Sequence, residues 1–377
     1  MRIGFDGKRA VLNFTGLGNY SRYIVDILCQ FYPENEYVLY APKKRENKRL
    51  NKLMKQYRQL QLSYPTTSFW KKLSSLWRVL GVTRQLEKER IDIFHGLSNE
   101  LPLNIHKSEV KSIVTIHDLI FLRYPQYYHS IDRNIYTYKF RKACENADKI
   151  IAISECTKRD IIEYFGIPAD KIEVVYQGCD TSFTRPATEK KKREVRANYQ
   201  LPDHYILNVG SIEERKNALS AVQALTMLPE QIHLVIVGRH TEYTDKIEHF
   251  IKENKLEERV HIISNVPFDD LPTFYQLAEI FVYPSRFEGF GIPIIEALYS
   301  GIPVVAATGS CLEEAGGPDS IYIHPDDIKG MANAFKQIYS DPEKKKEMIE
   351  KGQKFAKRFS EEKQAEEILN IYKKLMK

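Results

Sequence analysis

The segment 283–298 contains the residues best suited to bind an anion and to carry chemistry. An apolar strand pattern leads into a loop with glycines at Gly289 and Gly291, and a helix pattern follows. Backbone N–H groups of such a loop, together with the N-terminus of the helix, form a site for a phosphate. Glu288 stands at the entrance of the loop and Glu296 in the expected first helical turn. Two acids beside a phosphate are best suited to bind neutral hydroxyl groups. Without a ligand, the same residues would be a helix-dipole carboxylate and a tight turn.

The spacing Glu288-x7-Glu296 inside Pro-Ser-x-x-Glu-Gly-Phe-Gly resembles the signature of retaining glycosyltransferases of family four. This resemblance implies the GT-B fold, in which two Rossmann-like domains face each other across a cleft. It also implies transfer of a sugar from a nucleotide diphosphate donor with retention of configuration. On this resemblance, Glu288 orients the transferred sugar and Glu296 the ribose, and Gly289, Phe290 and Gly291 belong to the donor site.

A second segment, 208–217, is similar to the strand, turn and helix that carry the family's basic diphosphate ligands. Arg215 and Lys216 stand just before the expected helix, where cations can bind phosphate oxygens through charge-assisted hydrogen bonds. The alternative is a pair of exposed surface cations. Many family members carry an additional Arg where this chain has Ser211, so Arg215 is a candidate substitute. The predicted donor site further includes Gly210, Ser211 and Gly238.

In the N-terminal half, Gly16 and Gly18 follow the first strand and open a helix. The family places a flexible loop near the diphosphate here, although a plain tight turn would have the same sequence. A dinucleotide fingerprint is excluded because its third glycine would fall on Ser21.

Two histidines end predicted strands on the side expected to face the cleft. His117 corresponds to the histidine that the family sets against the donor sugar, and His95 is the rival candidate. Either histidine could equally well be a buried structural residue whose ring nitrogens are hydrogen-bonded within the protein. Near the end of the second half, segment 310–314 resembles the family's late loop, with Glu314 as the matching donor-site acid.

The sequence predicts no metal site and no cofactor. It contains no Asp-x-Asp, no His-x-x-x-His and no cluster of His and Cys. We therefore expect the charge of the diphosphate to be met by Lys216, Arg215 and backbone N–H groups.

Strand and helix patterns alternate along the chain, which predicts an α/β fold with two doubly wound parallel sheets that position these residues. Helix patterns occupy 18–31, 132–147 and 155–164 in the first half, with Asp132 and Ser154 at expected N-caps. Helices are expected near 217–227, 243–254, 269–277 and 293–299 in the second half. The predicted strands are 2–6, 36–41, 91–94, 112–116, 149–153 and 172–175, and then 205–209, 232–237, 259–263, 280–283 and 303–306.

The predicted domains are an acceptor-binding domain at 1–184 and a sugar-nucleotide-binding domain at 200–355. A linker or linker-proximal helix occupies 185–199, and the final helix, 356–377, is expected to cross back onto the first domain. Ligands of such sheets bind outside the carboxyl ends of the strands, so the predicted site is a cleft between the domains.

Composition bears on the cellular compartment of the protein and on the partners it could bind. The 377 residues contain five scattered cysteines without C-x-x-C spacing and no long apolar stretch. An early acid also argues against a signal peptide, so a reducing cytoplasm is expected. Residues 1–184 hold 29 Lys and Arg against 20 Asp and Glu, whereas 185–377 hold 27 against 30. The basic half could face nucleic acid, an anionic membrane or an anionic substrate, but no aromatic-basic nucleic-acid module accompanies it.

Segment 68–80 contains both tryptophans of the chain. As one regular helix it would present a single apolar face, with basic residues off that face. It could dock at the inner face of the plasma membrane, or it could be an ordinary helix that buries this face on the sheet. The expected apolar face consists of Trp70, Leu73, Leu76, Trp77 and Leu80.

The predicted partners are a nucleotide-diphosphate sugar, such as GDP-mannose or a UDP-sugar, and a saccharide or lipid-linked acceptor, with a growing surface glycan as the expected setting. Two other functions would fit the same fold. A sugar-nucleotide epimerase would convert the donor without an acceptor, and a non-catalytic protein would only bind it.

Overall fold

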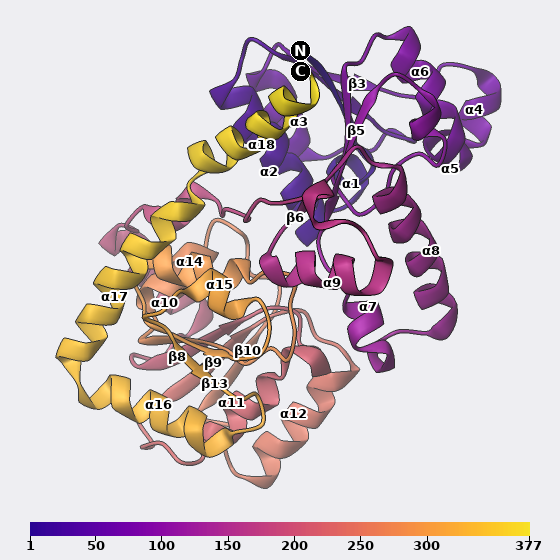
Figure 1. The fold of residues 1–377 in the computed structure, drawn as a ribbon. Helices are drawn as coiled ribbons and strands as arrows, with labels where there is room; N and C mark the ends of the chain where they lie inside the picture. Colours follow the sequence, from indigo (N-terminus) through magenta and orange to yellow (C-terminus); the bar gives the residue numbers. More distant parts are fainter. The chain divides into compact units, whose positions relative to one another are not determined.

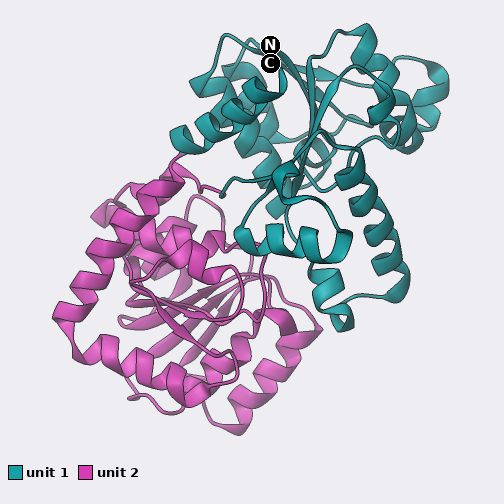
Figure 2. Cartoon of the chain, viewed as in Figure 1, with its two compact units in different colours: residues 1–176, 361–377 teal, residues 177–360 magenta.

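The computed structural model describes residues 1–377, which fold into two α/β units (Figure 2). Unit 1 comprises Met1–Tyr176 and Glu361–Lys377, and unit 2 comprises Gln177–Ser360. Each unit is built on one parallel sheet, so the predicted fold class is confirmed. The chain passes from unit 1 to unit 2 after Tyr176 and returns to unit 1 after Ser360.

The sheet of unit 1 has seven parallel strands in the order β3-β2-β1-β4-β5-β6-β7. In its centre, Phe5 is in register with Leu39 on one side and with His95 on the other. The edge strand β3 is absent from the sequence prediction because its four residues, Leu-Gln-Leu-Ser, are only partly apolar. The strands are β1 (Arg2–Asp6), β2 (Glu36–Tyr40), β3 (Leu60–Ser63), β4 (Ile93–Gly96), β5 (Lys111–Ile116), β6 (Lys149–Ala152) and β7 (Ile172–Val174).

Helices cover both faces of this sheet, because successive strand residues point to opposite sides. Leu39 enters the core beneath α1, α2, α3 and α18, whereas Tyr40 enters the core beneath α6, α7, α8 and α9. Helix α18 lies against α2 (Figure 1). The helices of unit 1 are α1 (Lys8–Leu12), α2 (Gly16–Phe31), α3 (Lys48–Gln56), α4 (Ser68–Lys72), α5 (Ser74–Leu76), α6 (Val82–Lys88), α7 (Ile120–Arg123), α8 (Ser130–Asn146), α9 (Glu155–Phe165) and α18 (Glu361–Leu375).

One of the two predicted N-caps is correct. The side chain of Ser154 accepts a hydrogen bond from the backbone N–H of Thr157 and caps α9. Asp132 is not a cap, since His129 precedes α8 and Asp132 lies in its first turn. A carboxylate is favourable there too, because it faces the positive end of the helix dipole.

The segment 68–81 does not form one regular helix. It consists of α4, α5 and a π-helical turn, η1 (Trp77–Gly81), with a break at Leu73. The break and the wider turn rotate the apolar residues apart. Trp77 is buried in the core, and its indole N–H donates to Gln85, whereas Leu76 and Leu80 remain exposed. The prediction of one continuous apolar face is therefore wrong.

The sheet of unit 2 has six parallel strands in the order β10-β9-β8-β11-β12-β13. Its central strands are buried apolar runs, as expected for a parallel sheet covered on both faces. The short edge strand β13 is missing from the sequence prediction. The strands are β8 (Tyr205–Val209), β9 (His233–Val237), β10 (Val260–Ile263), β11 (Ile280–Tyr283), β12 (Val304–Ala307) and β13 (Ile321–Ile323).

The stretch 185–199, read from sequence as a linker or linker-proximal helix, contains α10, which is part of unit 2. Asp270 holds this helix, since it pairs with Lys191 and accepts a hydrogen bond from Tyr199 over 2.8 Å. None of the helices combines the length and apolar character needed to cross a membrane. The helices of unit 2 are α10 (Glu189–Tyr199), α11 (Ala218–Leu225), α12 (Glu242–Glu253), α13 (Leu271–Leu277), α14 (Ile292–Ser300), α15 (Leu312–Gly316), α16 (Ile328–Ser340) and α17 (Pro342–Ala356).

Candidate active site

The topology of unit 2 marks one place on its sheet for a ligand. Strands β8 and β11 are neighbours, but the chain continues from β8 to β9 on one side and from β11 to β12 on the other. At such a switch point the loops after the two strands diverge and leave a crevice. These loops are 210–217 and 284–291, the two segments that the sequence analysis selected.

Two glycines allow the loop after β8 to approach its neighbour. A Cβ on Gly238 would lie 1.9 Å from the carbonyl oxygen of Gly210, so a side chain cannot fit there. Gly210 itself has a φ of 153°, and a Cβ on it would press on the side chain of Lys216. Ser211, which follows, is half-buried. These glycines therefore shape the turn that carries Lys216, and their contact with a donor stays a prediction.

Lys216 ends a 3₁₀ turn, η6 (Glu214–Lys216), and points at the carboxyl end of β11. Its Nζ donates to the hydroxyl of Tyr283 over 2.9 Å and lies 3.2 Å from Oε1 of Glu288. Burial lowers the pKa of Lys216, but the Glu288 carboxylate and Tyr283 together raise it, so that the net pKa is raised. Lys216 is therefore a charged ammonium group held in a mostly buried position.

Glu288 is the centre of the polar network. Its Oε1 accepts hydrogen bonds from the hydroxyls of Ser285 at 2.6 Å and Tyr283 at 3.1 Å. Burial raises the pKa of Glu288, but Lys216, Arg215 and the hydrogen bond from Ser285 together lower it, to about 2. The carboxyl group is thus ionised throughout the neutral range.

Arg215 joins the two loops. Its Nη1 lies 2.9 Å from Oε1 of Glu288 and also donates to the carbonyl of Phe287. Its own carbonyl accepts from the backbone N–H of Arg286 over 2.9 Å. The structure therefore brings Arg215, Lys216 and Glu288 together, and Glu213 lies 3.8 Å from another nitrogen of the Arg215 guanidinium, Nη2.

Glu296 lies apart from this ion cluster. It is the fifth residue of α14, not in the first turn as predicted, because the helix already begins at Ile292. Its Oε2 accepts from the hydroxyl of Tyr275 on α13 over 2.7 Å. Burial raises the pKa of Glu296; the hydrogen bond from Tyr275 lowers it, the charge of Asp180 raises it, and the result is about 7.

The loop 289–291 is fixed by packing. Gly291, with a φ of 132°, precedes α14, and the ring of Phe290 is buried against Phe359 with ring centres 5.6 Å apart. The thiol of Cys311 donates to the carbonyls of Glu288 and Phe290 over 2.9 Å each. The Phe290 side chain is thus a core anchor, which leaves the backbone as this loop's means of contacting a donor.

Glu314 lies in the first turn of the short helix α15, where its backbone N–H donates to the carbonyl of Cys311. This places it one turn after the residue that anchors the 289–291 loop. Its predicted donor contact stays a prediction.

In unit 1, Gly16 and Gly18 belong to the first turn of α2 and do not form a loop in front of it. A Cβ on Gly18 would lie 2.1 Å from the carbonyl oxygen of Asn13, so this glycine is required by a close backbone contact. A Cβ on Gly16 would meet nothing within 4 Å. Of the two, only Gly16 is without an evident packing reason.

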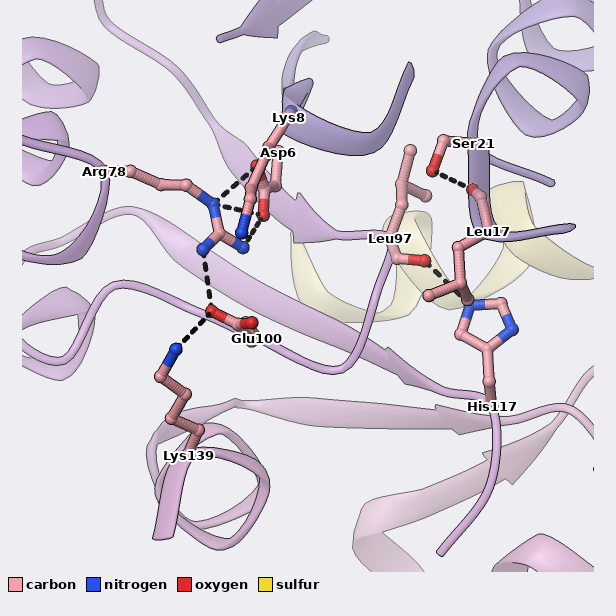
Figure 3. Close-up of polar contacts among 9 residues, drawn as sticks. All are labelled: Asp6, Lys8, Leu17, Ser21, Arg78, Leu97, Glu100, His117 and Lys139. Carbon is pink, nitrogen blue, oxygen red and sulfur yellow. Dashed lines mark hydrogen bonds and ion pairs between the residues drawn. The ribbon is translucent and has the colours of Figure 1, made fainter. Parts of the chain in front are cut away.

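The two candidate histidines differ in their surroundings. Both ring nitrogens of His95 are engaged inside the core, with Tyr372 at 2.7 Å and Thr115 at 2.8 Å. His117 donates from Nε2 to the carbonyl of Leu97 over 2.9 Å (Figure 3). Burial lowers the pKa of His117 to about 4, so its imidazole is neutral at physiological pH.

Unit 1 has its own switch point, between β1 and β4, with a charged cluster beside it (Figure 3). Asp6 ends β1 and pairs with Arg78, which also bonds Glu100 at 2.7 Å. Lys139 of α8 lies 3.8 Å from Glu100, and burial and Arg78 lower the pKa of nearby Lys8. The cluster has more cations than acids, an arrangement suited to an anionic group.

Sequence reasoning missed three hydroxyl groups that hold the acids. Tyr283 and Ser285 stand inside the recognised segment, where strand alternation could have suggested that Tyr283 points at the loop. Tyr275 is far from Glu296 in sequence, and no local signal connects the two. No three His, Cys, Asp or Glu side chains gather where they could hold an ion.

Two protein-family models match the two halves of the chain. The model described as Glycosyltransferase Family 4 matches residues 21–183, and the model described as Glycosyl transferases group 1 matches residues 189–355. The chain is 30% identical over 312 residues to the O-antigen chain mannosyltransferase B of Escherichia coli, and the aligned region covers 80% of each protein.

Two solved structures share the fold. One is a glycosyltransferase from Rickettsia africae, with a TM-score of 0.79 at 20% identity, covering 100% of this chain and 98% of that one. The other is HepE from Anabaena in complex with UDP and glucose, with a TM-score of 0.77 at 18% identity, covering 99% and 100%. The chain therefore belongs to glycosyltransferase family 4, and it is a retaining glycosyltransferase of GT-B fold that uses a nucleotide sugar as its donor.

Proposed function

We propose that this enzyme is a mannosyltransferase that uses GDP-mannose and extends a surface polysaccharide. The E. coli relative, which matches this chain over 80% of its own length, is named an O-antigen chain mannosyltransferase. This name supports mannose as the transferred sugar and a surface polysaccharide as the product. The observation that carries the proposal is the cluster of Lys216, Arg215 and Glu288 at the switch point of unit 2. It holds two cations in fixed positions beside the Glu288 carboxylate.

In the proposed reaction the bond between the sugar and the diphosphate breaks, and negative charge develops on the leaving diphosphate. Lys216 and Arg215 stabilise this charge, and because the fold already orients them, little reorganisation is needed. Glu288 orients hydroxyls of the transferred sugar and Glu296 those of the ribose. Backbone groups of Gly210, Ser211, Gly289 and Gly291 complete the donor site.

We assign the acceptor to unit 1. The charged cluster of Asp6, Arg78, Glu100 and Lys139 lies at the switch point of its sheet, where ligands of parallel sheets bind. Together with nearby Lys8, the cluster has three cations against two acids, which suits a phosphate in a lipid-linked saccharide acceptor. His117, as a neutral imidazole, serves as a hydrogen-bonding group for the donor sugar and not as a proton donor at neutral pH.

We also propose that catalysis needs no metal and that the enzyme works in the cytoplasm. The cations Lys216 and Arg215 already supply positive charge for the diphosphate. The five cysteines are all buried and form no disulfide, which fits a reducing compartment.

The experiment is a transfer assay with purified enzyme, a saccharide acceptor and a panel of donors, each run with and without excess EDTA. We expect release of GDP from GDP-mannose only when the acceptor is present, at the same rate in EDTA. Preference for a UDP-sugar would contradict the proposed donor. Activity lost in EDTA and restored by magnesium or manganese would contradict metal independence, and conversion of the donor without acceptor would contradict transfer.

A further inference from the structure

The surface of unit 1 between the segment 68–81 and helix α8 has an unusual share of exposed apolar side chains. Leu76 and Leu80 are 42% and 43% exposed, and on α8 Ile135 and Tyr138 are 45% and 56% exposed, with Ile131 at 72%. Large apolar side chains grouped in this way on a surface mark a binding face. We call this group of five residues the apolar face.

A pocket of about 340 Å³ adjoins the apolar face and shares Ile135 and Tyr138 with it. Val79 and Leu103 line it from one side and Ile135 and Tyr138 from α8. Its charged lining, Glu100 and Lys139, belongs to the cluster of Figure 3. Hydrocarbon that enters this pocket would therefore have a charged rim beside it.

The charges around the apolar face are mainly positive. Segment 68–81 contains the exposed Lys71 and Lys72 and no acid, whereas its third cation, Arg78, is paired with Asp6 and Glu100. Helix α8 contains four basic residues against Asp132 and Glu145, and Glu145 is paired with Lys142 at 2.6 Å. The two elements together are thus cationic, which disfavours a basic partner and favours an anionic one.

We propose that the apolar face, with its pocket and the exposed lysines, docks on an anionic lipid bilayer. Apolar side chains flanked by Lys and Arg are the pattern of interfacial membrane-binding elements, where hydrocarbon contact and attraction to anionic headgroups add. The irregular course of 68–81 is what creates this face, since the break at Leu73 and the turn η1 bury Trp77 and turn Leu76 and Leu80 outward. The pocket shares Glu100 and Lys139 with the cluster assigned to the acceptor, but the inference rests on the exposed apolar side chains and lysines and not on that assignment.

The test is co-sedimentation of the full-length protein with vesicles of phosphatidylcholine alone or mixed with phosphatidylglycerol, without nucleotide sugar or acceptor. We expect binding to the phosphatidylglycerol vesicles only, and less binding when salt rises from about 0.1 M to about 1 M and the screening length falls from about 10 Å to about 3 Å. No binding to anionic vesicles at low salt would overturn the proposal.

Two matched pairs of variants locate the contact. The Lys71→Gln/Lys72→Gln protein should bind anionic vesicles about 30-fold more weakly, given about 1 kcal/mol for each basic residue at a charged surface. The Lys52→Gln/Lys55→Gln protein has the same net charge, with exposed lysines on α3 of the same unit, and should bind like the wild type. Equal loss in both would show a non-specific charge effect and overturn the assignment.

The apolar pair is Ile135→Ser/Tyr138→Ser, with Ile162→Ser/Met227→Ser as the control at 37% and 40% exposure. Only the first should weaken vesicle binding, by roughly tenfold or more. Circular dichroism melting checks that each variant is folded. If sedimentation equilibrium instead shows a dimer that only the first variant abolishes, and vesicle binding is unchanged, the face binds a second copy and the bilayer proposal fails.

The chain provides its own reporter, because Trp70 and Trp77 are its only tryptophans and both lie in 68–81. Trp77 is already buried, whereas Trp70 is half-exposed. Docking should shift the emission of Trp70 to the blue on adding anionic vesicles. Vesicle binding with unchanged emission would place the contact elsewhere on the protein and contradict the proposal.

Discussion

The ammonium group of Lys216 lies 3.2 Å from Oε1 of Glu288, so the residue proposed to hold the diphosphate and the residue proposed to hold the sugar pair with each other. The carboxylate thereby keeps two buried cations in place without a donor. When the diphosphate binds, it must share these cations with Glu288. We infer that this pairing preorganises the site and makes donor affinity sensitive to either partner.

Removing the ammonium group should mainly slow the reaction. Lys216→Ala should lower kcat about 100- to 1000-fold, by analogy with the loss of one group that stabilises charge in the transition state. Lys252→Ala, an exposed lysine on α12 of the same unit, is the control. Steady-state kinetics with saturating acceptor measures the effect, and a rate like that of the wild type would remove Lys216 from the mechanism.

Substitution of the two acids should change different kinetic parameters. Glu288→Gln should lower kcat by about 10- to 100-fold, because a charged hydrogen bond that strengthens in the transition state is lost. Glu296→Gln should chiefly raise the donor KM by about 3- to 10-fold, since a ribose contact is equal in ground and transition states. Initial rates over a range of donor concentrations distinguish the two. Interchanged effects would contradict the assigned roles.

The raised pKa of Glu296 makes a prediction about stability. Burial raises this pKa to about 7, so the folded protein binds the proton more tightly than the unfolded chain does. The contribution to the free energy of unfolding is therefore complete below the ordinary glutamate pKa and is lost as pH rises through about 7. Glu296→Gln cannot ionise, so its free energy of unfolding should fall less than that of the wild type between about pH 5 and about pH 8.

Denaturant unfolding at these two pH values tests this expectation. The exposed Glu248→Gln on α12 serves as control and should follow the wild type. Parallel pH dependence for the Glu296→Gln variant and the wild type would mean that Glu296 is not held as a buried, protonated group.

The glycines that begin α2 should respond in opposite ways. Gly18→Ala places a Cβ 2.1 Å from a backbone oxygen and should destabilise unit 1 by about 1–3 kcal/mol. Gly16→Ala meets no neighbour and should be neutral or stabilising by about 0.4–1 kcal/mol. Thermal unfolding compares them. If the Gly16 variant is stable but transfers sugar poorly, Gly16 has the predicted role in the site; full activity would assign it to the helix alone.

The regular part of the fold was predictable from sequence because buried parallel strands are continuous apolar runs. All the central strands were found, and the misses were the edge strands β3 and β13, whose short, mixed sequences lack that pattern. The error in 68–81 has another cause. A helical pattern assumes a constant rotation per residue, and the break at Leu73 could not be seen in side-chain periodicity.

The loop residues of the site could be predicted from the sequence, but their contacts with one another could not. Arg215, Lys216 and Glu288 could be selected as candidates because each stands in a recognisable turn after a strand, and their roles stay predictions. Their mutual pairing was not foreseen, because it depends on how loops 210–217 and 284–291 meet across two adjacent strands. Tyr275 was missed for the same reason, since its contact with Glu296 arises from the packing of α13 on α14.

Helix α18 completes the core of unit 1 with residues from the very end of the chain, among them Ile368 and Tyr372. During synthesis, the whole of unit 2, residues 177–360, is made after the first part of unit 1 and before this helix. At about 5–20 residues per second, that interval lasts roughly ten to forty seconds. The unit that is translated first is thus finished last, and until then the face of its sheet that receives α18 lacks its native cover.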